Sequence, residues 1–160
     1  MNIKIERRID NGKVIDGFLT INAEKICDCA ENSAHALAPG RYNIYMHRCG
    51  QLGRRMPMVD FDDDDYKQVE CDECCECHPL EYVDKNTNLP CYCPMFSAGN
   101  GAYSRKDGSV LVGEYVAPGC LIHTQKHFDA LFDRIRATLK RDAKVTLTVL
   151  ESSDFKCRSL

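Results

Sequence analysis

Cysteines crowd one short stretch of this 160-residue sequence. Six of its eleven cysteines lie between residues 71 and 93, where the chain reads CDECCECHPL and, further on, CYCP. Thiols this close together can attack a substrate, form disulfides or hold a metal ion, and the last two uses restrict the fold of the segment that carries them. The odd number of cysteines argues against a closed set of disulfides.

The redox environment decides between disulfides and a metal ion. The first residues, MNIKIERRIDNGKVIDGF, carry charges at short intervals and lack the apolar core of a secretion signal. No stretch approaches the roughly 20 apolar residues of a membrane-spanning helix. We therefore expect a cytoplasmic chain with reduced thiols and no membrane partner. Release on lysis and association with a virion are the alternatives.

Two short cysteine pairs supply an economical set of four zinc ligands. Cys71 and Cys74 form a C-x-x-C pair, and Cys91 and Cys93 form a C-x-C pair after a loop of ordinary length for a zinc site. A site filled by four protein ligands has no open position for water or substrate, so we expect the Zn²⁺ to be structural. Three further donors in the same window are substitutes: Cys77, His78 and Cys75.

One zinc ion is not the only use for these thiols. Disulfides in an exported product, an iron–sulfur cluster, two metal ions and free thiols are the alternatives. Outside the cluster, Cys27 and Cys29 share one face of an expected strand. Together with Cys49, we expect them to act as small hydrophobic side chains.

Alternation of apolar and polar residues predicts a mainly β (α+β) fold that opens with a β-meander. Asn11-Gly12 predicts the first tight turn, with positive φ at both positions. The basic pairs Arg7-Arg8 and Arg54-Arg55 and the acidic run at 61–67 are expected to be solvated surface. Strands are expected over residues 2–9, 13–21, 25–30, 41–49, 110–116 and 144–151.

One long helix is expected over residues 123–142. Its apolar residues repeat at helical spacing, and Thr124 is the expected N-cap. We expect this helix to pack on a mixed sheet within a single domain, residues 1–151, with the metal-binding insertion at about 67–95 and a frayed tail over 152–160. The expected buried face comprises Phe128, Leu131, Phe132, Ile135 and Leu139.

The charge balance excludes one class of partner. The net charge is −3, and basic residues are not concentrated in one region of the sequence. Nucleic-acid binding needs a concentrated basic face, so we expect no nucleic-acid partner.

Six motifs outside the cysteine cluster resemble, in order, those of an uncharacterised family of bacterial and phage proteins, domain-of-unknown-function family 5675. The cysteine-rich segment is an insertion between the third motif and the fourth. The family's His and Gly-Cys pair is similar to the active site of L,D-transpeptidases of the YkuD-like fold, in which a cysteine thiolate attacks a peptide carbonyl of peptidoglycan. The motifs are IDGFLTI (15–21), CDCAEN (27–32), APGRYNIYM (38–46), FSAGN (96–100), GSVLVGE (108–114) and LIHTQKHFDAL (121–131).

The resemblance places serines where that chemistry needs its reacting pair. Ser97 occupies the histidine position and Ser109 the cysteine position. A serine without a base has no activated form. The resemblance therefore implies a non-catalytic relative that binds a protein or cell-wall partner. Such a relative would be encoded by a phage or another mobile genetic element.

A second Gly-Cys pair offers an alternative. In PGCLIH (118–123), Cys120 could be the nucleophile of a peptidoglycan transpeptidase or hydrolase. The simpler interpretation makes Cys120 a buried thiol before the helix and His123 a helix-start residue. The candidate bases for the enzyme are His123, His127, His47 and His35.

Overall fold

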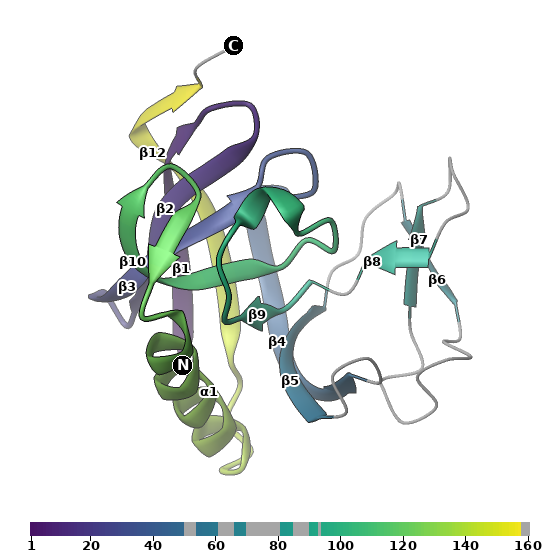
Figure 1. Ribbon diagram of the computed structural model, residues 1–160. Helices are drawn as coiled ribbons and strands as arrows, with labels where there is room; N and C mark the ends of the chain where they lie inside the picture. The colour runs from purple at the N-terminus through teal and green to yellow at the C-terminus, as the bar shows by residue number, and fades with distance from the viewer. Residues whose placement is uncertain (50–53, 61–65, 70–80, 85–89, 93, 158–160) are drawn as a thin grey trace.

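The fold is mainly β with one long helix, as the alternation in the strands and the helical repeat predicted. Figure 1 shows a curled sheet with the helix lying across one end. In the described residues, no helix has the length and apolar character needed to cross a membrane. The computed structural model describes residues 1–49, 54–60, 66–69, 81–84, 90–92 and 94–157.

The large sheet begins with the expected meander of three antiparallel strands. These are β1 (Asn2–Asp10), β2 (Val14–Ile21) and β3 (Glu24–Asn32). The sheet order is β11-β10-β3-β2-β1-β12-β4-β5, with β9 added beside β10. The other strands are β4 (Gly40–Cys49), β5 (Arg54–Asp60), β9 (Phe96–Ser97), β10 (Val110–Ala117), β11 (Cys120–Ile122) and β12 (Thr146–Cys157).

A separate small sheet has three antiparallel strands. Figure 1 shows it to one side of the large sheet. Its strands are β6 (Tyr66–Val69), β7 (Glu81–Asp84) and β8 (Pro90–Tyr92). Residues of β5 and of these three strands show no alternation clear enough to predict them as strands.

The turns of the meander differ from the expected ones. Gly12 has φ 82°, but Asn11 is not in the left-handed region; its Oδ1 instead accepts the N–H groups of Lys13 and Val14, each at 2.9 Å. The two consecutive positive φ values occur in the second hairpin, 50° at Asn22 and 73° at Ala23. The prediction of positive φ at both positions of the first turn was therefore wrong, because the Asn11 side chain closes that turn instead.

The helix α1 (Thr124–Leu139) buries the predicted face. Phe128, Leu131 and Ile135 are fully buried, whereas Phe132 and Leu139 of the predicted face are partly buried. The helix contacts β10 and β5. The predicted N-cap was wrong. His123 is the N-cap, with φ 52° and no side-chain cap, whereas Thr124 Oγ1 accepts the N–H of Gly99 at 3.1 Å.

The central strands carry the core. Burial of one large apolar side chain contributes about 1.5–3 kcal/mol, so these strands make a large contribution to the stability of the sheet. The fully buried aliphatic residues of β1, β2 and β12 are Ile3, Ile5, Leu19, Ile21, Leu147 and Val149.

Two expectations about surface and tail were wrong. Arg7 is buried, because Glu31 neutralises it. Residues 152–157 do not fray. They continue β12, where Lys156 pairs with Ile9 and Cys157 with Asp10 of β1.

Candidate functional site

The two serines singled out by the sequence lie on neighbouring strands. Ser97 ends β9, and Ser109 directly precedes β10. These strands pair in parallel, with Leu111 opposite Ser97. Because Ser109 lies two residues before Leu111, both serines are on the same side of the sheet. The topology therefore brings the two family positions together.

The partners of these serines are not bases. Ser97 is 7 % exposed, and its hydroxyl donates to the carbonyl of Ala98 at 2.9 Å. Ser109 is 1 % exposed, and its Oγ lies 3.5 Å from Nη2 of Arg105, itself 3.1 Å from Asp107. A backbone carbonyl and a guanidinium do not take a proton, so neither contact activates a hydroxyl for attack.

Cys120 is exposed in the short strand β11. The simpler sequence interpretation, a buried thiol, was wrong. Asp16 of β2 holds the hairpin turn that precedes Cys120. The N–H of Gly119 in this turn donates to both carboxylate oxygens of Asp16, at 3.0 and 3.3 Å. Burial raises the pKa of Asp16, and the Gly119 hydrogen bond offsets part of that rise.

A carboxylate joins two of the candidate bases. Glu114 Oε2 lies 3.2 Å from Nδ1 of His123, and Oε1 lies 3.0 Å from Nε2 of His127. The hydrogen bond to His127, and then that to His123, lowers the pKa of Glu114. We call Glu114, His123 and His127 the histidine–glutamate cluster. The sequence missed Glu114, because a strand carboxylate near a helix start carries no recognisable spacing.

Close approach of β10 and the helix start builds this cluster. Gly113 precedes Glu114, and a Cβ there would lie 2.7 Å from the carbonyl oxygen of Ile122 and 3.0 Å from Cγ2 of Thr124. Only glycine allows this spacing, which places Glu114 within reach of both imidazoles.

The two remaining candidate bases are not part of this cluster as described. His35 lies in the turn after β3, where its backbone N–H donates to the carbonyl of Asn32. The side chain of His47 is outside the described part of the chain. The structure therefore gathers His123 and His127 of the four candidates.

The thiols within β3 behave as predicted. Cys27 and Cys29 are both buried. Burial raises the pKa of Cys27 to about 12 and raises that of Cys29 well above its ordinary value. A thiol that stays protonated is a poor nucleophile and a poor metal ligand, so both act as small hydrophobic side chains.

The predicted zinc ligands stay a prediction. Only the backbone of Cys91 is described, in β8. Among the residues whose side chains are placed, no three His, Cys, Asp or Glu are already spaced to hold an ion. The other candidate ligands lie outside the described residues: Cys71, Cys74, Cys75, Cys77, His78 and Cys93.

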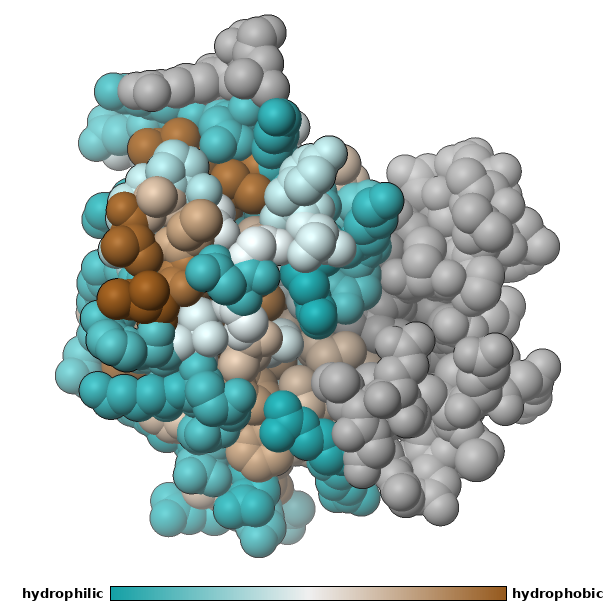
Figure 2. Space-filling view, viewed as in Figure 1, coloured by the Kyte–Doolittle hydropathy of each residue, from teal (hydrophilic) through white to brown (hydrophobic). Residues whose placement is uncertain are grey.

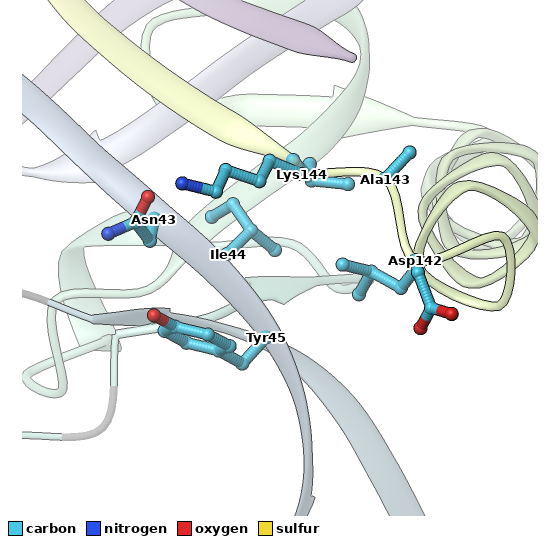
Figure 3. Close-up of a pocket in the computed structure, with 8 residues that line it drawn as sticks. Asn43, Ile44, Tyr45, Asp142, Ala143 and Lys144 are labelled. Atoms are coloured by element: carbon cyan, nitrogen blue, oxygen red, sulfur yellow. The ribbon is translucent and has the colours of Figure 1, made fainter.

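A pocket of about 310 Å³ lies between β4 and the turn that connects α1 to β12. In Figure 3, the Lys144 side chain extends toward Asn43, whereas the Asp142 carboxylate points away from Asn43. The pocket offers an apolar floor with an amine at its rim, but no residue that the sequence predicted as functional lines it. The lining residues are Asn43, Ile44, Tyr45, Leu139, Asp142, Ala143, Lys144 and Val145.

Hydrophobic side chains gather on the surface over the β10–β11 hairpin, at the left of Figure 2. Tyr115, Val116 and Ile122 are each exposed there. Ile122 lies opposite Glu114 in the hairpin register, so the patch adjoins the histidine–glutamate cluster.

Comparisons with protein-family models, with curated proteins and with solved structures found no match. The resemblance to family 5675 and to L,D-transpeptidases therefore stays a prediction from the six motifs.

Proposed function

We propose that this chain is a non-catalytic binding protein: a curled β sheet that carries a zinc-stabilised, cysteine-rich insertion and binds a protein or cell-wall partner. One observation carries the first half of the proposal. Serines replace the thiol and the imidazole at the family-type positions, and the contacts of the Ser97 and Ser109 hydroxyls are to a carbonyl and a guanidinium, neither of which is a base.

The small sheet supports the zinc half of the proposal. Its strands have four, four and three residues, shorter than the typical length of about five or six. Structural zinc contributes about 10–16 kcal/mol in isolated fingers, enough to stabilise such a segment. The insertion would then stay ordered through its metal rather than through a core.

The strand register also favours one grouping of ligands. Val69 pairs with Glu81, and Tyr92 pairs with Tyr82, so β6 and β8 both end where β7 begins. Cys71 follows Val69 by two residues, and Cys93 directly follows Tyr92. Two residues span at most about 7 Å, so the register supports a shared site for the two cysteine pairs.

Metal-resolved native mass spectrometry tests the zinc site. In protein purified without added metal, we expect one zinc per chain, and its loss in a variant with Cys71→Ser and Cys74→Ser. The matched control is Cys120→Ser, which removes an exposed thiol outside the insertion and should keep the metal. A metal-free folded chain with disulfides among the clustered cysteines would contradict the proposal.

Purified peptidoglycan sacculi test the binding function. We expect the chain to sediment with sacculi from which surface proteins have been stripped, while the profile of released and cross-linked muropeptides stays unchanged. Val116→Asp places a charge in the exposed patch and should weaken sedimentation if the hairpin takes part. A changed muropeptide profile would show catalysis instead.

One observation favours the enzyme alternative. Glu114 holds Nδ1 of His123, as an orienting carboxylate does in nucleophile–histidine–acid sites, and Cys120 is exposed nearby in sequence. A change in the muropeptide profile that disappears in both Cys120→Ser and His123→Ala would establish this alternative. A muropeptide profile that the unmodified chain leaves unchanged would exclude peptidoglycan chemistry at Cys120.

A further inference from the structure

We propose that the histidine–glutamate cluster binds a divalent transition-metal ion, such as Ni²⁺, Cu²⁺ or Zn²⁺. The site is separate from the cysteine-rich insertion and does not depend on the proposed binding function. It is carried by two contacts of the Glu114 carboxylate, to Nδ1 of His123 at 3.2 Å and to Nε2 of His127 at 3.0 Å.

The donor set selects the class of ion. Imidazole nitrogen suits zinc, copper and nickel, whereas calcium and magnesium prefer sites built from oxygen alone. Two imidazoles and a carboxylate also form the protein ligand set of a common type of catalytic zinc site, in which water fills the remaining position. Water would complete the coordination here, because the cluster faces solvent.

The three side chains converge from two directions. Glu114 comes from β10, and the histidines come from the N-cap and the first turn of α1. The carboxylate now stands between the imidazoles, so the donors are spaced for hydrogen bonds and not for coordination, in line with the absence of a ready-made site among the described residues. An ion would replace these two hydrogen bonds.

Exposure makes that rearrangement feasible. The side chain of His123 is 59 % exposed and that of Glu114 is 46 % exposed, whereas that of His127 is 17 % exposed. His127 therefore provides a fixed ligand, and the other two can turn about their side-chain bonds to meet an ion at about 2.0–2.2 Å. Gly113 keeps the backbones close enough for this.

Paramagnetic nuclear magnetic resonance locates the ion directly. Ni²⁺ is added to the full-length, ¹⁵N-labelled chain, and the broadening of backbone amide signals is followed. We expect broadening centred on residues 114, 123 and 127. This readout separates the site from the insertion, because Ni²⁺ bound to the cysteines would broaden signals of residues 67–95 instead.

Three variants and one control make the assignment specific. Loss of even an outer partner of a ligand weakens metal binding about 10–100-fold. We therefore expect His123→Ala, His127→Ala and Glu114→Gln each to weaken Ni²⁺ binding at least about tenfold. His35→Ala, which removes a histidine elsewhere, should leave the affinity unchanged.

Exposure of His123 and Glu114 lets their variants fold, and amide signal dispersion checks this. Broadening centred elsewhere would overturn the proposal, as would the absence of site-specific broadening at about 1 mM Ni²⁺, a concentration that detects even millimolar binding. Unchanged affinity in the folded His123→Ala chain would overturn it as well.

Discussion

Arg7 of β1 and Glu31 of β3 form a buried, bidentate ion pair across the intervening strand β2. Arg7 Nε donates to Glu31 Oε2 at 2.8 Å, and Nη2 donates to Oε1 at 2.7 Å. Nη2 also donates to the carbonyl of Leu37 at 2.6 Å, which ties the segment after β3 to the sheet. Burial opposes the charge on Arg7, but the contact with Glu31 outweighs it and raises the pKa of the guanidinium.

Glu31→Ala should destabilise the chain by about 3–5 kcal/mol, because it leaves a buried guanidinium without its counter-charge. Urea unfolding followed by circular dichroism measures this change. The control is Glu6→Gln, which disrupts a partly exposed pair with Lys4 and should change the free energy of unfolding by at most about 1 kcal/mol. Equal effects of the two substitutions would contradict the assigned burial.

Ala23→Gly should stabilise the chain by about 0.5–1 kcal/mol. Ala23 has φ 73°, a region in which an alanine is strained by about 1–2 kcal/mol and a glycine is not. Ala130→Gly is the matched control, since Ala130 is exposed within α1. It should destabilise by about 1 kcal/mol. Thermal unfolding compares the two, and a loss of stability in Ala23→Gly would contradict the strained turn.

Asp16→Asn should stabilise the chain at neutral pH, by up to about 1 kcal/mol. The pKa of Asp16 is raised above its ordinary 3.8, so the folded chain binds more protons than the unfolded chain just above pH 3.8, and stability falls as the pH rises through the raised pKa. The asparagine oxygen can still accept the N–H of Gly119. The advantage of Asp16→Asn should vanish below pH 3.8.

Asp28→Asn is the control of opposite sign. Burial tends to raise the pKa of Asp28, but the hydrogen bond from Lys25 and the N–H of Tyr115 more than offset it, so the pKa is lowered. Its stabilising effect is present above pH 3.8 and is lost as the pH falls through the lowered value. Asp28→Asn should therefore destabilise at neutral pH. The same pH dependence in both variants would contradict these environments.

Cysteine alkylation should distinguish the exposed thiol of Cys120 from the buried thiols of Cys27 and Cys29. With iodoacetamide at neutral pH, we expect modification of Cys120, which is exposed, and protection of Cys27 and Cys29, which are buried. Peptide mapping by mass spectrometry identifies each site, and all three should react in urea. Modification of Cys29 in the folded chain at the rate of Cys120 would contradict the packing of β3.

Regular patterns were readable from the sequence. The alternation in β1, β2 and β3 and the helical repeat from Phe128 to Leu139 each reflect a buried face, so the main strands and the helix were predicted with small errors in their ends. The burial of Cys27 and Cys29 was predicted from the same alternation.

Features that depend on a distant partner were not readable. Arg7 looked like surface, because only β3 supplies the Glu31 that neutralises it. Residues 152–157 looked frayed, because their partner is the far end of β1. Glu114 joins His123 and His127 only after β10 and the helix start are brought together, and no local pattern encodes that meeting.

The placement of β12 has a consequence for how the molecule is made. The last strand in the sequence lies between β1, its parallel partner, and β4, its antiparallel partner. During synthesis, no strand can join β1 to β4 until β12 (Thr146–Cys157) has left the ribosome. The sheet can therefore close only after β12 has been made, and a chain shortened before Thr146 should leave two bare strand edges open to aggregation.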